Sequence, residues 1–176
     1  MNIIIIILLV MAGIIALLLV IALFMKKEHY VHCEFIINAP RQKVFDFLKL
    51  LRNQEQFNKY AKADPGRKEQ LKGTDGTVGF TISWSGNKDA GEGEKEIMSI
   101  VEGERIETEI RFVKPIETSA RIIMKTESVS EDKTKVSWSN SGKLKYPFNI
   151  MIPIAEKNFA KDMNFSLSTL KSILEK

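Results

Sequence analysis

The hydrophobic positions of this chain follow three different patterns in succession. Residues 3–25 carry no charged side chain and form one continuous apolar run. Residues 67–142 alternate between apolar and polar positions with a period of two, which is typical of strands that bury one face. Near the C-terminus, apolar side chains recur at spacings of three and four, which predicts one face of a long helix. The chain is therefore expected to combine an apolar segment, a sheet and a terminal helix.

The apolar run at residues 3–25 is long enough to cross the roughly 30 Å hydrocarbon core of a membrane as a helix. A cleaved signal peptide would instead carry basic residues before a shorter apolar stretch and small residues before its cleavage site. Asn2 is neutral and the run ends in A-L-F-M-K-K, so we expect a retained transmembrane anchor. Lys26 and Lys27 follow the run and no basic residue precedes it. The positive-inside rule then predicts a single-pass membrane protein whose C-terminal domain is cytoplasmic.

The remainder of the chain, about 150 residues, has the size of one domain. The segment 31–37 predicts a first strand, which is followed by a helix over residues 40–51 and a short helical turn over 54–60. The last helix begins after Pro147 or Pro153 and runs to the C-terminus. The region of period two predicts strands at residues 77–84, 93–101, 105–112, 118–128 and 135–141.

These elements predict an α+β domain in which a curved antiparallel sheet wraps the long C-terminal helix. We accordingly divide the chain into a transmembrane anchor at 1–25, a linker at 26–30 and a folded domain at 31–176. An arrangement of this kind tends to leave a cavity between the sheet and the helix.

Composition excludes several classes of function. The chain has 26 Lys and Arg against 22 Asp and Glu, and the two signs are interleaved, whereas nucleic-acid binding usually concentrates cations on one face. Cys33 is the single cysteine, so no intrachain disulfide can form. His29 and His32 lie three positions apart, and on a strand two such residues point to opposite faces, which disfavours a metal site. We predict no metal, no cofactor and no nucleic-acid partner.

The stretch T-I-S-W-S-G-N-K-D-A-G-E-G-E-K-E-I contains Gly86, Gly91 and Gly93. A phosphate-binding loop would need a glycine pattern that opens a helix and places a cation beside the anion. Here the glycines are followed by glutamates and by a predicted strand. The stretch is therefore interpreted as two strands joined by a glycine-rich turn.

Several short motifs then occur in an order that resembles a known group. They are F-I-I-N-A-P-R-Q-K-V-F-D-F-L at 35–48, V-G-F-T-I-S-W-S-G-N with G-E-G-E-K-E-I, R-F-V-K-P-I-E at 111–117, T-K-V-S-W at 134–138 and L-S-T-L-K at 167–171. Together they resemble the START-like or SRPBCC superfamily, which includes polyketide cyclases/dehydrases and lipid-transport proteins. The resemblance implies a helix-grip fold, in which about seven antiparallel strands surround a long C-terminal helix. It also implies an apolar pocket between the sheet and the helix.

Alternation along the predicted strands and the stripe of the last helix indicate which side chains would line such a pocket. The indoles of the two tryptophans and the amide of Asn140 are the polar groups expected to orient a ligand there. The predicted pocket residues are Phe80, Ile82, Trp84, Ile110, Phe112, Met124, Trp138, Asn140, Phe159 and Met163. A buried carboxylate can serve as a general acid or base, and Glu94 and Glu96 are the candidates for that role. Their strand register is left open, because Lys95, Ile97 and Ser99 compete with Glu96, Met98 and Ile100 for the inner face.

The leading hypothesis is a membrane-anchored domain that binds a hydrophobic or lipid-like small molecule without chemistry. A cyclase or dehydratase that uses Glu94 or Glu96 is the first alternative, and a non-catalytic envelope or stress-response interaction module is the second. The sequence indicates neither the ligand nor the oligomeric state.

Overall fold

The structure is a computed structural model that describes residues 2–62, 64–88 and 90–176. Its helical elements are α1 (Ile3–Phe24), α2 (Arg41–Lys49), α3 (Leu51–Glu55), α4 (Lys59–Lys62), the 3-10 turn η1 (Phe148–Met151) and α5 (Ile152–Leu174). Its strands are β1 (Glu28–Ile37), β2 (Lys68–Lys72), β3 (Thr81–Ser85), β4 (Glu92–Val101), β5 (Arg105–Lys114), β6 (Thr118–Ser130) and β7 (Lys133–Lys143).

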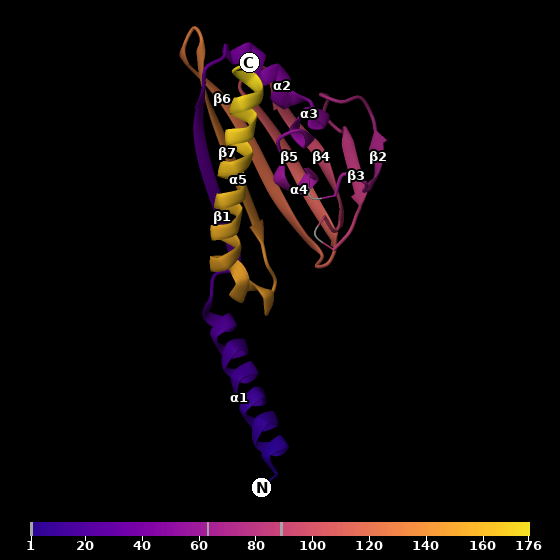
Figure 1. The fold of residues 1–176 in the computed structure, drawn as a ribbon, viewed down its shortest axis with the longest axis vertical. Coiled ribbons are helices and arrows are strands. Elements are labelled where there is room, and N and C mark those ends of the chain that lie inside the picture. Colours follow the sequence, from indigo (N-terminus) through magenta and orange to yellow (C-terminus); the bar gives the residue numbers. More distant parts are fainter. Residues whose placement is uncertain (1, 63, 89) are drawn as a thin grey trace.

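The seven strands form one antiparallel sheet in the order β1-β7-β6-β5-β4-β3-β2. Every neighbouring pair except β1 and β7 is consecutive in the chain. β1 and β2 lie at opposite edges of the sheet, although they follow each other in the chain. The sheet curves around α5, which lies along the side formed by β1 and β7 (Figure 1). This arrangement confirms the predicted α+β class and the curved sheet around a C-terminal helix.

The main core lies between α5, α2 and the inner face of β1, β6 and β7. Apolar side chains that recur along α5 meet those of α2, and all of them are buried. The side chains that form this core from the two helices are Val44, Phe45, Leu48, Met163, Leu167, Leu170 and Leu174. A smaller cluster of Leu51, Phe80, Ile82 and Ile97 fills the space between α3 and β3–β4. Between these two filled regions the inner face of the sheet is left partly uncovered.

Two strands begin several residues away from the predicted positions, and one strand was not predicted. β1 begins at Glu28, within the segment 26–30 that we predicted as a linker, because residues 28–30 pair with the end of β7. β3 begins at Thr81 rather than at residue 77, because the preceding residues form a turn in which Thr77 donates its backbone N–H to Thr74. β2 was not predicted, since all five of its residues are exposed and it has no alternation to detect.

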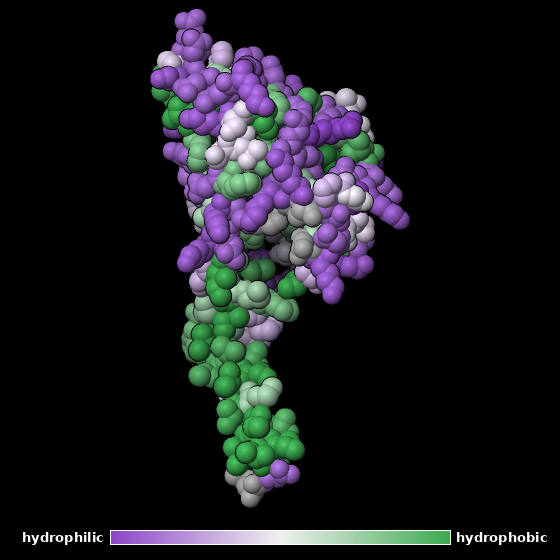
Figure 2. All heavy atoms as spheres, in the orientation of Figure 1, coloured by the Kyte–Doolittle hydropathy of each residue, from purple (hydrophilic) through white to green (hydrophobic). Residues whose placement is uncertain are grey.

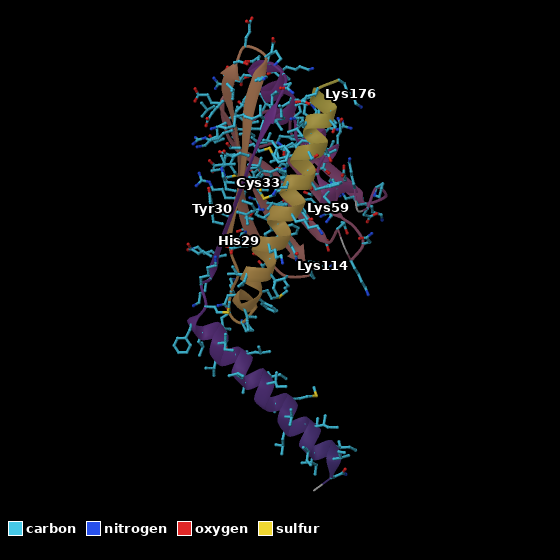
Figure 3. All side chains as sticks on the ribbon, turned by 60° about the vertical axis from the view of Figure 1, so that its left-hand side comes forward. His29, Tyr30, Cys33, Lys59, Lys114 and Lys176 are labelled. Carbon is cyan, nitrogen blue, oxygen red and sulfur yellow. The ribbon has the colours of Figure 1, made fainter. Side chains whose placement is uncertain are left out.

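One helix, α1, is long and apolar enough to span a membrane. Figures 1 and 3, which view the molecule from two sides, both show α1 extending away from the domain. Its side chains are exposed along almost the whole length, and Ala22 is the one described α1 residue that is buried. An exposed apolar helix of this kind is unlike a core helix of a soluble domain.

The end of α1 is tied to the domain rather than loosely tethered. The amide of Asn149, in η1, donates hydrogen bonds to the backbone oxygens of Ala22 at 2.7 Å and Met25 at 3.1 Å. These carbonyls lie at the helix C-terminus, where no intrahelical N–H is available to them. Lys26 also forms an ion pair with Glu156 of α5 at 2.7 Å. The side chain of Asn149 therefore caps α1 from the first turn of the domain's last helical segment.

Candidate ligand cavity

An enclosed cavity of about 240 Å³ lies between α5 and the inner face of the sheet. Apolar side chains from β3 to β7 form one wall, and α5 forms the opposite wall. Residues of α3 and α4 close one side. The side chains that line it are His29, Glu55, Asn58, Ala61, Arg67, Ile82, Trp84, Ala90, Lys95, Ile110, Phe112, Thr118, Ser119, Ala120, Ile122, Trp138, Asn140, Leu144, Phe159, Asp162, Met163 and Ser166.

The structure brings most of the predicted pocket residues to this cavity. Eight of the ten line it, namely Ile82, Trp84, Ile110, Phe112, Trp138, Asn140, Phe159 and Met163. Phe80 does not, because it packs into the smaller cluster with Leu51 and Ile97. Met124 does not either, because it lies in the main core, where α2 and α5 already fill the space beside it. That the cavity binds a ligand stays a prediction.

The two indole groups in the cavity wall differ in their hydrogen bonding. Trp84 donates its Nε1–H to the backbone oxygen of Ala90 at 3.0 Å, so this donor is already used. The Nε1–H of Trp138 is buried and has no hydrogen-bond partner among the described residues. A buried indole donor usually has a partner, so the Nε1–H of Trp138, a side chain that lines the cavity, is an unpaired donor among the described residues.

His29 contributes a second incompletely bonded group. Its Nε2 lies 3.1 Å from Oδ1 of Asn140, while its Nδ1 is buried without a partner among the described residues. Gly142 makes room for the ring, because a Cβ at that position would lie 2.6 Å from Cε1 of His29. Asn140 was predicted as a pocket residue, but His29 was interpreted only as a residue beside the anchor. Because β1 begins at Glu28, His29 lies on this strand, and its side chain lines the cavity.

Sequence reasoning missed a charged cluster at the end of the cavity beside α3. Lys95 of β4 is 5% exposed, and its Nζ donates a hydrogen bond to Oε1 of Gln54 at 2.5 Å. Burial lowers the pKa of Lys95 to about 8. Glu55 forms an ion pair with Arg67, but burial still raises the pKa of its carboxyl group above the ordinary value. The guanidinium of Arg67 lies 5.6 Å from the centre of the Trp84 ring.

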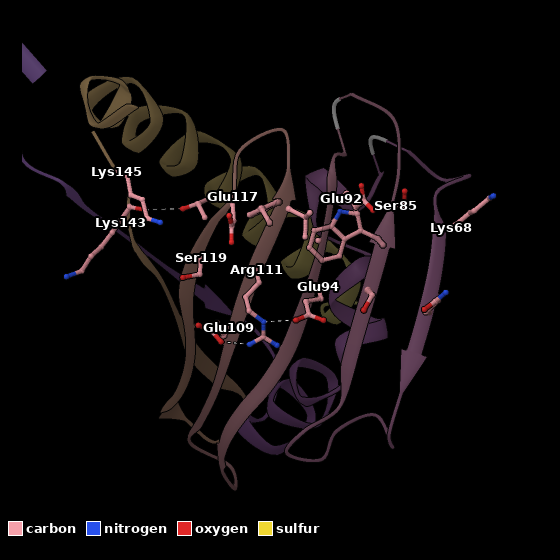
Figure 4. A pocket seen from close by; sticks show the side chains of 17 residues that line it. Lys68, Ser85, Glu92, Glu94, Glu109, Arg111, Glu117, Ser119, Lys143 and Lys145 are labelled. Atoms are coloured by element: carbon pink, nitrogen blue, oxygen red, sulfur yellow. Dashed lines mark hydrogen bonds and ion pairs between the residues drawn. The ribbon is translucent and has the colours of Figure 1, made fainter. Parts of the chain in front are cut away.

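The register of β4 places Glu94 and Glu96 outside the cavity. Gly93, Lys95 and Ile97 are buried, and the residues between them face away from α5. Figure 4 shows Glu94, Glu109 and Arg111 together on this outer face. Arg111 donates to Glu94 at 2.7 Å and to Glu96 at 2.5 Å, and it also pairs with Glu109. The two candidate acid/base residues therefore form part of a surface ion-pair network around one guanidinium.

A wider depression of about 950 Å³ lies on that outer face. It is lined largely by ion-paired and hydroxyl side chains, including Glu92, Glu94 and Arg111 (Figure 4). It is more open than the inner cavity, and its Arg111 already pairs with Glu94 and Glu109. The inner cavity is therefore the better candidate for a ligand site. Within the described residues, no group of three or more His, Cys, Asp or Glu side chains could hold a metal ion.

Comparison with known proteins gives a clear result for the fold alone. No family model and no curated protein matches the chain. Among solved structures, norcoclaurine synthase from Thalictrum flavum is 13% identical with a TM-score of 0.62, and the match covers 88% of this chain and 90% of that chain. Ara h 8.0201 is 15% identical with a TM-score of 0.53, covering 81% of this chain and 98% of that chain. The Aha1 dimer protein from Colwellia psychrerythraea is 17% identical with a TM-score of 0.55, covering 83% and 96%.

The chain has the helix-grip fold. At such low identities the matches indicate nothing about the ligand. In this helix-grip domain the uncovered part of the inner sheet face is the cavity described above.

Proposed function

We propose that this protein is a membrane-anchored helix-grip domain that binds a hydrophobic or lipid-like small molecule in the inner cavity. The observation that carries the proposal is the cavity itself, which is enclosed and mainly apolar and holds the unpaired indole donor of Trp138. Ligand sites commonly combine an apolar wall with a few polar groups of this kind. The solved structure of norcoclaurine synthase, which shares the fold, contains dopamine and hydroxybenzaldehyde.

The surface beside the anchor supports the membrane part of the proposal. Large apolar side chains are exposed where the domain meets α1, namely Tyr146, Phe148, Met151 and Ile154. In Figure 2 the apolar surface of α1 continues onto this lower part of the domain, whereas the upper part is mainly hydrophilic. The cavity lining includes Leu144, which follows β7 and donates its backbone N–H to the backbone oxygen of Lys27 at 2.9 Å, shortly after the end of α1. A ligand dissolved in the bilayer would thus have a short path to the cavity.

The side of the membrane follows from the charges near α1. Lys26 and Lys27 lie at the C-terminal end of the helix, and we propose that the domain is cytoplasmic. Protease treatment of intact spheroplasts tests this topology, and we expect the domain to resist digestion until the membrane is opened. Digestion from outside would contradict the cytoplasmic location but not the binding of a ligand.

Extraction of the purified protein with organic solvent, followed by mass spectrometry, tests ligand binding. We expect a copurified small molecule from the wild type and its loss from Ala120→Phe, because residue 120 lines the cavity and a ring would fill part of it. Lys125→Phe adds the same ring to an exposed position of the same strand and should retain the molecule. An empty wild type that also binds no lipid or quinone probe would refute the proposal.

The positions of Glu94 and Glu96 do not support the alternative of a cyclase or dehydratase. Both lie outside the cavity and pair with Arg111, so neither reaches a ligand held there. The alternative of a non-catalytic interaction module has no observation in its favour. We therefore propose only the binding function.

A further inference from the structure

The amino group of Lys95 lies at the buried end of the cavity and has an unusual environment. It donates to Oε1 of Gln54 at 2.5 Å, while Nε2 of Gln54 donates to the backbone oxygen of Leu48 at 2.7 Å. The second bond fixes the orientation of the amide, because only its nitrogen can donate to a carbonyl oxygen. Lys95 is therefore held by a neutral acceptor that brings no compensating negative charge.

The other charges near Lys95 are already engaged. Glu55 pairs with Arg67, and Arg67 also donates to Glu69 at 2.8 Å. The carboxylate of Asp75 accepts backbone hydrogen bonds from Leu51 at 2.8 Å and Arg52 at 3.1 Å.

Within the described residues, no carboxylate lies within 4.0 Å of the Lys95 amine, since every such ion pair involves other cations. Glu55 pairs directly with Arg67, whereas its charge and that of Asp75 act on Lys95 without a direct ion pair.

A buried ammonium without a direct ion pair is costly, and burial lowers the pKa of Lys95 even though the charges of Glu55 and Asp75 act against that shift. A negative charge delivered by a ligand to hydrogen-bonding distance would reduce this cost. One carboxylate matches one cation that lacks a direct ion pair, whereas a phosphate monoester would bring an excess of negative charge into the same buried site.

We propose that the cavity selects an amphipathic small molecule with a single carboxylate, which pairs with Lys95 while its apolar part lies against Ile110, Phe112 and Ile122. This inference rests on the proposed function, because it names the ligand class of the same cavity. The volume of about 240 Å³ restricts the ligand to a compact or short-chain acid. The apolar wall alone would not distinguish an acid from the corresponding alcohol, so Lys95 is the residue that determines specificity.

The test compares two probes with the same apolar skeleton, 4-phenylbutyrate and 4-phenylbutan-1-ol. Calorimetric titration would use the full-length protein in nanodiscs at pH 7, with empty nanodiscs as the blank. We expect the wild type to bind the carboxylate about tenfold or more tightly than the alcohol, as a charge-assisted hydrogen bond would provide. Lys95→Met should abolish this preference, and Lys68→Met, which removes an exposed lysine of β2, should retain it.

A second measurement needs no variant. Raising the pH from 7 to 9.5 should weaken carboxylate binding to the wild type by roughly tenfold, because the amine loses its proton, and should leave alcohol binding unchanged. Equal affinity for the two probes, or a carboxylate preference that survives in Lys95→Met, would overturn the inference while leaving the proposed function intact. Binding of neither probe to the wild type would overturn the inference, whereas the proposed function is refuted only by the extraction and probe experiment described above.

Discussion

Replacement of Lys95 by methionine should change how the stability of the domain depends on pH. Methionine keeps much of the length and volume of the lysine stem but carries no charge, so the variant removes the buried ammonium with little change in packing. The unfolded chain holds the Lys95 proton up to about pH 10.5, whereas burial lowers the pKa in the folded chain to about 8. Folding therefore favours the neutral amine, and the wild type loses stability as the pH falls through this window.

The size of the effect follows from the two pKa values. The full penalty, which applies below pH 8, is about 3 kcal/mol. At pH 9.5 the folded protein holds the amine neutral, and only about 1 kcal/mol of the penalty remains. The free energy of unfolding of the wild type should thus rise by about 2 kcal/mol relative to that of Lys95→Met between pH 7 and pH 9.5. The lost hydrogen bond to Gln54 affects the variant at both pH values, so it largely cancels in this difference.

Urea unfolding in detergent micelles, followed by tryptophan fluorescence, measures this difference. Trp84 and Trp138 are the two tryptophans of the chain and both are buried, so their emission reports the folded domain directly. Lys68→Met serves as the control, because its lysine is exposed and its removal should not alter the pH dependence. If the stability difference between wild type and Lys95→Met stays the same at the two pH values, burial does not disfavour the charged form of Lys95. An acidic ligand would then no longer be expected in the cavity.

Three further predictions concern other parts of the molecule. Gly93→Ala should cost about 1–3 kcal/mol in urea unfolding, because its Cβ would lie 2.5 Å from the Arg111 backbone oxygen. Gly66→Ala, where the nearest atom is 3.8 Å away, should be nearly neutral. Arg111→Met should lower the free energy of unfolding by about 1 kcal/mol in the same urea assay, because three carboxylates then lose their shared cation. Asn149→Ala should speed hydrogen exchange at the junction of α1 and β1, but not in the central sheet, because two helix-end carbonyls lose their donor. An unchanged exchange rate at the junction would refute the capping role.

The sequence predicted the architecture because the long elements carry clear periodicities. Because α5 buries one face, its apolar residues recur with the helical period. Because β5 and β6 each bury one face, apolar and polar residues alternate along them. Both periodicities can be recognised in the sequence. The strand β2 has no buried face, so it leaves no such pattern. Its place at the edge of the sheet comes from pairing with β3, which is a property of the tertiary structure.

The cavity was predictable in its apolar wall but not in its polar end. Alternation assigned Trp84, Ile110 and Trp138 to the inner face without knowledge of the fold's curvature. The register of β4 could not be assigned, since a lysine and two glutamates alternate with apolar residues on both faces. Only the pairing of Lys95 with Ile82 and Ile110 on the neighbouring strands places the lysine inside and the glutamates outside. A buried charge contradicts the hydrophobic pattern on which such predictions rest.

The cap that Asn149 forms on α1 would have a mechanical consequence if α1 spans a bilayer, as we propose. A transmembrane helix adjusts its tilt to the thickness of the surrounding hydrocarbon layer. If a flexible tether joined the helix to the domain, a change in the tilt of the helix would leave the orientation of the domain unchanged. Here Asn149 is fully buried and joins the helix end to the segment that starts α5, so a change of tilt would rotate the whole domain. The angle between the cavity and the membrane would then vary with the lipid composition around α1, which makes membrane thickness a determinant of access to the ligand site.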